Sequence, residues 1–273
     1  MASYQKNLLQ LPLLGLINNA NQLCINLRTA EKGPDLNPPL SPNALPKYIQ
    51  ISEMLIREIA AGHFVDGARL PPERDMAADL DISVGTLRKA LADLVEKGLL
   101  DRVQGSGNYV RNRGAVGSVY AFFRLELIGG GGLPTAHVVS VDRLPKPQNM
   151  RAFGSSDQGH RIRRLRCLGA ALVAVEEIWL DAAYRDVITV GDLSDSLYHF
   201  YRTELGVVIA SVTDEIGVGY VPDWVPDRFH LRAGTTVGYI ERVSFTAAGV
   251  AAEFSRTWFD SDKSRYVSWL GKG

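Results

Sequence analysis

Three side chains in the C-terminal half of the sequence could together bind a small anion. Arg164 and Arg166 are two residues apart, so on a strand their guanidinium groups point to the same face of the sheet. Two guanidinium groups on one face form a fork that suits a carboxylate or a phosphate. Glu176 is expected on the next strand, where it could accept hydrogen bonds from sugar hydroxyls or from a ligand amine. The alternative is a solvated face whose exposed ion pairs contribute little.

Ser196 could extend such a site. It lies near the start of a helix expected over 195–206, where its hydroxyl and the unpaired backbone amides would favour an anion. No nucleophile stands beside a base, and the five histidines and the two cysteines, Cys24 and Cys167, lack metal-ligand spacing. We therefore expect no catalytic residue, no metal and no cofactor, and two reduced thiols in a cytoplasmic protein.

A second group of polar residues, in the N-terminal half, has the chemistry to contact DNA. The polar side and the N-terminal end of a predicted helix carry Ser83, Gly85, Thr86, Arg88 and Lys89. A helix fits the major groove, and its N-terminal residues reach base edges. Six basic residues stand against three acidic ones over 82–113, although the whole chain balances 30 against 30. Specificity should therefore depend more on geometry than on an excess of charge.

Two short helices must position these residues. Pro71 and Pro72 suit a first helical turn, and the helix that follows should end near Asp79. Ser83 can cap a second helix, and Gly98 marks its end. The apolar stripe of the second helix, with spacings of three and four, is Leu87, Ala90, Leu91 and Leu94.

A glycine-tipped hairpin follows, with strands expected over 99–103 and 108–110 and a turn at 104–107. With a further amphipathic helix over 48–61, the order of elements predicts a winged helix-turn-helix domain over 46–113. The glycine turn can approach phosphates or the minor groove, because no Cβ stands in the way. An ordinary helical hairpin packed in a core is the alternative.

The remainder of the chain predicts a mostly antiparallel α+β domain over 118–271. Strands are expected at 136–144, 160–168, 172–180, 207–221, 234–245, 250–260 and 266–270, and helices at 147–153, 195–206 and 223–231. The glycine run 129–132 is a loop, since neither a Lys-Ser/Thr pair nor a helix start follows it. Residues 1–45 should form a flexible N-terminal extension. Its apolar run at 8–17 is too short to span a bilayer, so we expect no membrane association.

Three segments of the first domain are distinctive, namely 70–75 (LPPERD), 82–91 (ISVGTLRKAL) and 104–110 (QGSGNYV). They resemble the DNA-binding domain of GntR-family bacterial transcription regulators. The resemblance implies that operator DNA is contacted by Arg74, Ser83, Thr86, Arg88 and Gly105, and we add the neighbouring Lys89. Val84 stands where the family often has arginine. Because valine can touch a thymine methyl but cannot bridge guanine acceptors, the operator should differ from the family's commonest pattern.

Five segments of the second domain are 139–141 (VSV), 164–166 (RLR), 173–177 (VAVEE), 196–198 (SLY) and 252–257 (AEFSRT). They resemble the UTRA effector-binding domain of the HutC-type branch of GntR regulators, over roughly 118–271. The resemblance implies a fold like that of chorismate lyase that binds a small molecule and does not transform it. The positions it implies for effector binding are Arg164, Arg166, Glu176, Ser196, Tyr198, Glu253 and Ser255.

This order of two domains predicts a transcription regulator, most often a repressor in this family, that binds double-stranded operator DNA as a homodimer. A two-fold protein requires a near-palindromic operator. A small-molecule effector, expected to be anionic, would favour the arrangement that releases DNA. Two alternatives stay open: a lyase-like enzyme that acts on a small anionic substrate, and a DNA-binding dimer whose second half only dimerises.

Overall fold

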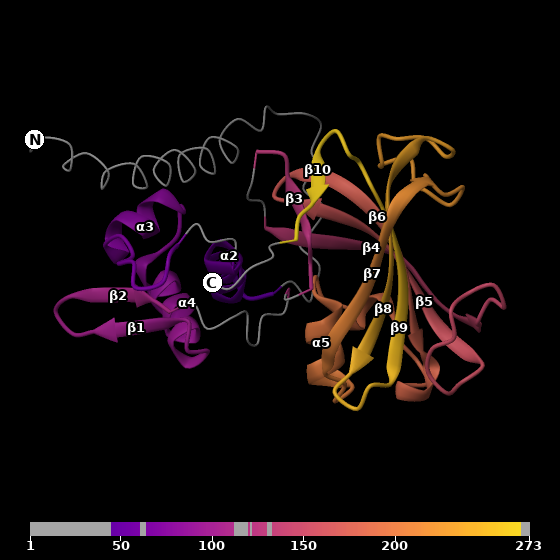
Figure 1. Ribbon diagram of the computed structural model, residues 1–273, viewed down its shortest axis with the longest axis horizontal. Helices are drawn as coiled ribbons and strands as arrows, with labels where there is room; N and C mark the ends of the chain where they lie inside the picture. Colours follow the sequence, from indigo (N-terminus) through magenta and orange to yellow (C-terminus); the bar gives the residue numbers. More distant parts are fainter. Residues whose placement is uncertain (1–44, 61–63, 112–119, 121, 130–132, 269–273) are drawn as a thin grey trace, which may run out of the picture. The chain divides into compact units, whose positions relative to one another are not determined.

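A computed structural model gives the fold of the chain (Figure 1). It describes residues 45–60, 64–111, 120, 122–129 and 133–268. Two compact units divide these residues, the first within 46–118 and the second within 119–268 together with Leu45. Apart from Leu45, the extension predicted for 1–45 lies outside the described residues. Within the described part, no helix has both the length and the apolar character to cross a bilayer, and no three His, Cys, Asp or Glu side chains gather as metal ligands.

The first unit is the predicted winged helix-turn-helix. Its elements are α2 (Lys47–Ala60), α3 (Glu73–Asp79), α4 (Val84–Glu96), β1 (Leu100–Val103) and β2 (Gly107–Val110). The two strands pair antiparallel, with Leu100 opposite Val110 and Val103 opposite Gly107. The hairpin therefore turns at residues 104–106, where the sequence places glycine.

Local sequence signals set the ends of α4. The Oγ of Ser83 caps its N-terminus by accepting a hydrogen bond from the Thr86 N–H at 3.1 Å. Beyond its C-terminus Gly98 has a φ of +70°, which glycine adopts without strain. The helix α4 buries an apolar stripe against α2, and no residue of the stripe is more than 1% exposed. The stripe consists of Leu87, Ala90, Leu91 and Leu94. Burial of this stripe leaves the polar side of α4 exposed.

The second unit is built on one six-stranded sheet. In their order across the sheet, the strands are β4 (Pro134–Pro145), β5 (Gln158–Leu168), β6 (Ala171–Asp181), β9 (Ala251–Phe259), β8 (Thr236–Thr246) and β7 (Ile209–Tyr220). Every neighbouring pair is antiparallel. The pairing of β6 with β9 joins two halves of the sheet that are distant in the sequence. The predicted antiparallel α+β architecture is confirmed.

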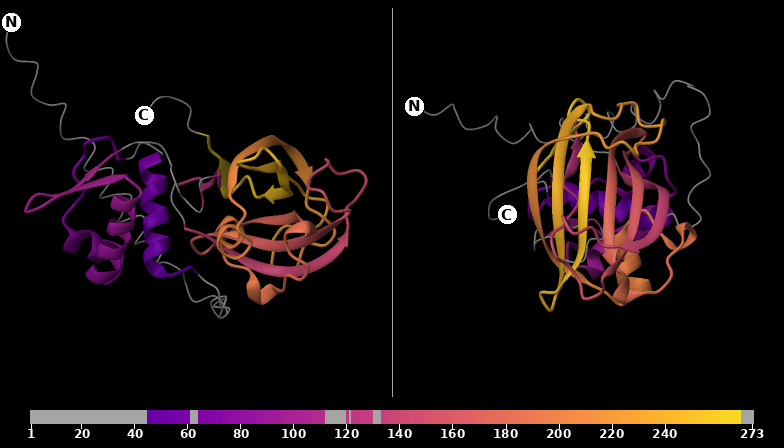
Figure 2. Two further views of the ribbon diagram at one scale, coloured as in Figure 1. Left: turned by 90° about the horizontal axis from the view of Figure 1, so that it is seen from below. Right: turned by 90° about the vertical axis from the view of Figure 1, so that its right-hand side faces the viewer.

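Smaller elements cover one face of this curved sheet (Figure 2). They are α5 (Leu197–Glu204), the ribbon of β3 (Leu125–Leu127) with β10 (Ser264–Tyr266), and the short helices η1 (Ala182–Tyr184) and η2 (Val190–Asp192). Phe200 and Tyr201 of α5 pack in a core cluster with Ile162 of β5, and Leu125 of β3 packs in another with Phe259 of β9. The side chains of the sheet that lie between α5 and β3 can therefore border a cavity.

The helix predicted over 147–153 is wrong. This segment forms a single turn, in which the Met150 N–H donates to the Pro147 carbonyl at 3.2 Å. Met150 and Phe153 instead pack in a cluster with Trp179. Burial of these apolar side chains against the sheet thus overrides the local helical preference of the segment.

The helix predicted over 223–231 is also wrong. The segment forms two separate turns, closed by hydrogen bonds from Val225 to Pro222 at 3.1 Å and from Phe229 to Pro226 at 2.9 Å. Because Pro226 has no N–H to donate, one continuous helix cannot run through it without losing a hydrogen bond.

The last predicted strand, 266–270, is misplaced. The observed strand β10 is Ser264–Tyr266, and it pairs only with the three residues of β3. The ladder ends where Tyr266 meets Leu125, and beyond it a single backbone hydrogen bond follows, from the Val267 N–H to the Arg124 carbonyl at 2.8 Å. Residues 269 and 270 lie outside the described part of the chain.

Candidate functional site

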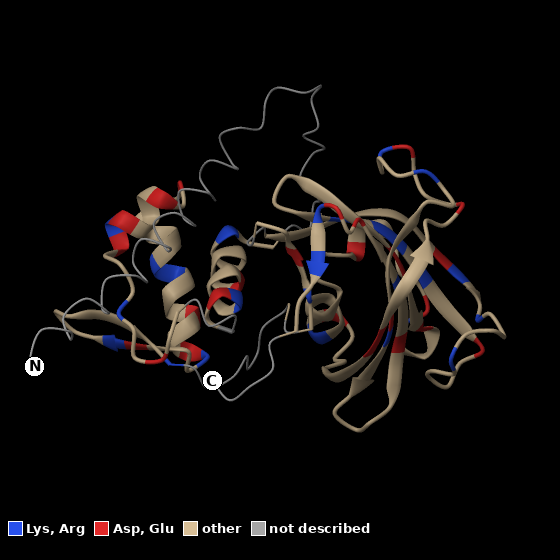
Figure 3. Ribbon diagram, turned by 45° about the horizontal axis from the view of Figure 1, so that its top comes forward, with Lys and Arg blue, Asp and Glu red and all other residues tan. Residues whose placement is uncertain are grey.

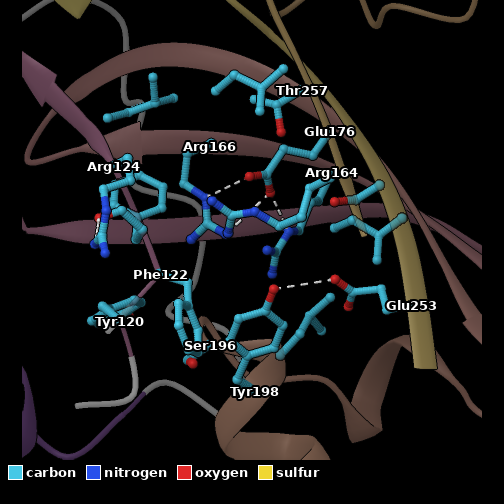
Figure 4. Close-up of a pocket in the computed structure, with 17 residues that line it drawn as sticks. Tyr120, Phe122, Arg124, Arg164, Arg166, Glu176, Ser196, Tyr198, Glu253 and Thr257 are labelled. Atoms are coloured by element: carbon cyan, nitrogen blue, oxygen red, sulfur yellow. Dashed lines mark hydrogen bonds and ion pairs between the residues drawn. The ribbon is translucent and has the colours of Figure 1, made fainter. Parts of the chain in front are cut away.

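The covered face of the sheet contains a pocket that is partly open to solvent (Figure 4). Strands β5, β6, β8 and β9, the start of α5 and the segment leading into β3 border it. All seven side chains predicted to bind an effector line this pocket, namely Arg164, Arg166, Glu176, Ser196, Tyr198, Glu253 and Ser255. Residues from four separate elements thus meet in one cavity.

Arg164, Arg166 and Glu176 form a buried ion-pair cluster in this pocket (Figure 4). Arg164 lies opposite Glu176 in the β5–β6 register, and its Nε donates to Oε2. Arg166 donates from Nη2 to the same oxygen at 3.1 Å and from Nε to Oε1 at 3.3 Å. The three side chains are only 7%, 3% and 8% exposed, so a solvated face with weak ion pairs is wrong for these residues.

The charges of this cluster leave room for a further anion. Burial favours the neutral form of Glu176, but the two guanidinium groups outweigh it and lower the pKa of the carboxyl to about 2. Two cations therefore share one carboxylate. The Nη1 of Arg164 is buried and has no hydrogen-bond partner among the described residues. A carboxylate or phosphate oxygen of a ligand would supply the missing acceptor.

Hydroxyl groups surround Glu253 at another part of the pocket wall. Tyr201 donates to Oε2 at 2.6 Å, and Ser244 and Tyr198 donate to Oε1 at 2.9 and 3.3 Å. Burial raises the pKa of Glu253, and these hydrogen bonds offset it only in part. Ser255, two residues further along β9, adds another buried hydroxyl to the same face. Such a group of hydroxyls and a carboxyl suits the hydroxyl groups of a ligand.

The N-terminal end of α5 lies beside the guanidinium cluster. The Oγ of Ser196 caps this helix by accepting from the His199 N–H at 3.3 Å, and the Ser194 hydroxyl donates to the Ser196 carbonyl at 2.7 Å. Arg166 reaches the carbonyl of Asp195 with its Nη1 at 3.2 Å. The positive end of the helix dipole therefore adds to the guanidinium charge.

In the first unit, the residues predicted to contact DNA lie on the open side of α4, on α3 and at the hairpin turn. Those that are exposed are Arg74, Ser83, Arg88, Lys89 and Gly105, and Thr86 is half-buried. Gly105 has a φ of +73°, so the turn requires glycine there. Figure 3 shows basic positions on α4 and β1 and the acidic start of α3.

Two arginines of this surface bind one carboxylate that the sequence did not single out. Arg88 Nε donates to Glu73 Oε2 at 2.6 Å, and Arg102 Nη2 donates to Glu73 Oε1 at 2.7 Å. The hydrogen bond from Arg88 is the main cause that lowers the pKa of Glu73. The Arg88 side chain is still 64% exposed, so its guanidinium can bind a second partner.

Both units match known families. The model of the family described as "Bacterial regulatory proteins, gntR family" matches residues 47–110, and the model of the UTRA domain matches residues 130–265. The chain belongs to the GntR family. It joins the DNA-binding domain of that family to an effector-binding UTRA domain, in the order that the sequence predicts.

Whole-length relatives of this GntR-family chain are regulators. It is 57% identical over 225 residues to the HTH-type transcriptional regulator SmoD of Agrobacterium fabrum, a match covering 82% of this chain and 96% of SmoD. It is 28% identical over 232 residues to the mannosyl-D-glycerate transport/metabolism system repressor MngR of Escherichia coli, covering 81% and 95%. A solved structure of the regulator YydK from Bacillus subtilis matches with 21% identity and a TM-score of 0.48, covering 83% and 100%. The two family matches and the 57% identity to SmoD show that the GntR-family chain is a DNA-binding transcription regulator, and the lyase-like alternative is set aside.

The sequence did not reveal that aromatic side chains of the segment before β3 line the effector pocket. The segment that leads into β3 contributes Tyr120, Phe122, Phe123 and Arg124 to the lining. The Arg166 guanidinium lies over the Phe123 ring, 5.0 Å from its centroid. The apolar run over 118–128 is visible in the sequence, but nothing local indicates that it turns toward β5.

Arg242 is a charged residue of the pocket that was also missed. It donates to Asp214 on β7 through Nε and Nη2, at 2.6 and 2.7 Å. The pairing of β8 with β9 places Arg242 opposite Ser255, which was predicted. A correct register for these two strands is the signal that would have found Arg242.

Proposed function

We propose that this GntR-family regulator is a repressor that binds a near-palindromic operator as a homodimer and releases it when an anionic effector occupies the UTRA pocket. Its relative MngR is named as a repressor. A near-palindromic operator offers two half-sites, and a two-fold protein can set one winged helix on each. Because a bacterial regulator must reach DNA inside the cell, we expect the protein to act in the cytoplasm.

The unpaired Nη1 of Arg164 is the observation that carries the effector proposal. A buried cationic donor without an acceptor costs free energy, which an anionic oxygen of a ligand would recover. The Tyr198 and Ser255 hydroxyls and the Glu253 carboxyl, which line the pocket, offer partners for ligand hydroxyls. We therefore propose an effector that carries a carboxylate or a phosphate together with several hydroxyl groups. The name of MngR links that protein to mannosyl-D-glycerate, which combines these groups.

The proposed operator contact comprises Arg74, Ser83, Thr86, Arg88, Lys89 and Gly105. The exposed side chain of Arg88 has the length and the fork to bind a guanine edge in the major groove. Lys89 and Arg74 suit phosphates, as does the backbone of the glycine turn. Val84, at the first position of α4, would contact a thymine methyl.

Release of DNA requires an effector that distinguishes two arrangements of the dimer. An effector that binds the operator-competent and the released arrangement equally well changes nothing, however tightly it binds. We propose that the pocket closes around its ligand more completely when the winged helices do not match the operator spacing. The coupling is then reciprocal, so operator DNA should weaken effector binding by the same factor.

Two measurements on the full chain test this function. Footprinting on DNA upstream of its own and neighbouring genes should show a protected, near-palindromic sequence. A thermal-shift screen of sugar acids, hydroxy acids and phosphosugars should find compounds that raise the melting temperature and abolish the footprint.

Two variants then connect that response to the pocket. Arg164→Met should retain the footprint and lose the response to the compound. Tyr198→Phe, which keeps the ring and loses one hydroxyl, should require more compound for the same release. A footprint that no compound affects would favour the alternative of a DNA-binding dimer without an effector.

A further inference from the structure

We infer that β7 is the strand through which two copies of this chain associate, by antiparallel pairing with β7 of the second copy centred on Val218. This inference rests on the homodimer proposed above and names the surface that would form it. The argument uses the two edges of the sheet, the side chains on β7 and the position of its charges.

The two edge strands of the described sheet, β4 and β7, differ in how well they are protected against pairing with another chain. β4 begins and ends with proline, its register shifts between Val138 and Ser140, and it carries the charged Asp142 and Arg143. Prolines, bulges and charges are the devices that prevent an edge from pairing with another chain. β7 has no proline, lysine or arginine in its twelve residues, and its one register shift lies at its start. The edge at β7 is therefore open to pairing.

The C-terminal half of β7 carries an exposed apolar row. Ile216, Val218 and Tyr220 are 54%, 75% and 69% exposed. Because they are two residues apart, they project from the same face of the strand. Gly217 and Gly219 alternate with them, so the other face of this half carries no side chain. A contiguous apolar row on an unprotected edge is typical of a protein–protein contact.

The acidic residues and the apolar row of β7 together select the register of the pairing. Both acidic residues, Asp214 and Glu215, lie in the middle of the strand, and Glu215 is 58% exposed as a side chain. Pairing centred on Glu215 would set two carboxylates opposite each other, which is unfavourable. Pairing centred on Val218 sets Ile216 against the partner's Tyr220 and Val218 against the partner's Val218. The paired segment is then 216–220, both acidic residues lie outside it, and six apolar side chains meet in one row.

Asp214 of β7 connects the proposed dimer contact to the effector pocket. Asp214 of β7 accepts two hydrogen bonds from Arg242, and Arg242 lines the pocket. Tyr266 donates to the same aspartate at 2.7 Å. A ligand that moves Arg242 would therefore act directly on the strand that forms the dimer.

A charge-exchange experiment on the full chain tests the contact. The variant Ile216→Lys/Tyr220→Lys sets ammonium groups opposite each other, and Ile216→Glu/Tyr220→Glu does the same with carboxylates. Each alone should raise the dimer dissociation constant by roughly 100-fold, because apolar pairs are lost and like charges face each other. An equimolar mixture should recover the dimer, since lysines then face glutamates. Sedimentation velocity measures both results.

The control is Val139→Lys on β4, which adds a charge at an exposed valine of the other edge strand and should leave the dimer intact. Circular dichroism should show that all the variants remain folded, since every substituted position is exposed. If the wild type is a dimer and both charged variants dimerise equally tightly, the β7 contact is overturned and the proposed homodimer still holds. A wild-type monomer at micromolar concentration, with and without DNA, would overturn both.

Discussion

Glu176 and Glu253 line the same pocket, but their carboxyl groups are held in opposite ways. Burial disfavours the ionised form of both. Two guanidinium groups outweigh burial at Glu176 and lower its pKa to about 2. Glu253 accepts hydrogen bonds from hydroxyls, and there burial prevails and raises the pKa. The two carboxyl groups should therefore respond to substitution and to pH with opposite signs.

Glu176→Gln should destabilise the effector-binding unit. The substitution leaves Arg164 and Arg166 buried without their carboxylate, which typically costs about 3–5 kcal/mol of unfolding free energy. Replacing all three residues, as Arg164→Met/Arg166→Met/Glu176→Leu, removes every charge of the cluster and should restore most of the stability. Urea denaturation followed by circular dichroism measures both variants. If Glu176→Gln were as stable as the wild type, the cluster would not hold the strands through its ion pairs.

The same carboxylate should make stability fall at low pH. The folded-state pKa of Glu176 is about 2, below its usual value of 4.5, so the unfolded chain takes up the proton first. The stabilisation is complete above pH 4.5 and is lost as the pH falls through 2. The difference in unfolding free energy between the wild type and Glu176→Gln should therefore shrink across this window. Glu204→Gln, at an exposed position of α5, controls for the loss of a surface charge.

Glu253→Gln should show the opposite dependence. Because its folded-state pKa is raised above 4.5, the folded protein binds the proton more tightly than the unfolded chain. Wild-type stability therefore contains a penalty that grows as the pH rises from 4.5 through the folded-state pKa. The variant lacks this penalty, and its amide oxygen can still accept from Tyr201. Its unfolding free energy should exceed that of the wild type at pH 7 but not below pH 4.5. A variant that is less stable at every pH would contradict this assignment.

The features that could be predicted from the sequence follow from local rules. The ends of α4 are set by the Ser83 cap and by Gly98, both within one turn of the helix. Arg164 and Arg166 share a face because side chains alternate along any strand. The family resemblance then supplied residues such as Glu253 that no local pattern singles out.

The features that were missed depend on contacts between distant segments. Arg242 lines the pocket only because β8 pairs with β9 in one register. The false helix at 147–153 has an acceptable local sequence, but its apolar side chains are buried on the sheet near Trp179. Glu73 is unremarkable in the sequence, and its role depends on how α3 packs against α4. Tertiary packing decides each of these cases.

Arg88→Ala should weaken discrimination between the operator and unrelated DNA. A lost side-chain contact to a base typically costs about 1–3 kcal/mol of discrimination. Lys89→Ala is the matched control, since this neighbouring residue is also exposed and is proposed to bind a phosphate. The control should weaken binding to both DNAs alike and reduce its salt dependence. Fluorescence anisotropy with an operator duplex and a scrambled duplex separates the two effects. An equal loss on both duplexes for Arg88→Ala would remove Arg88 from the residues that read bases.

Glu73→Gln should change specificity without touching a base. Its carboxylate holds Arg88 of α4 and Arg102 of β1 in one orientation before DNA arrives. Removing this charge makes the surface more positive, so affinity for unrelated DNA should rise and depend more steeply on salt. Affinity for the operator should rise less than affinity for unrelated DNA, because Arg88 must then be ordered when it binds a base. The ratio of operator affinity to unrelated affinity should fall roughly 3- to 10-fold.

The control separates charge from orientation. Glu96→Gln removes an equal charge at the exposed end of α4, away from both arginines, and should shift affinity for both DNAs without changing their ratio. Anisotropy titrations of both variants over a series of salt concentrations give the ratio and its slope. If Glu96→Gln lowered the ratio as much as Glu73→Gln, net charge alone would explain the effect. If Glu73→Gln left the ratio unchanged at every salt concentration, its carboxylate would have no part in positioning Arg88 for the operator.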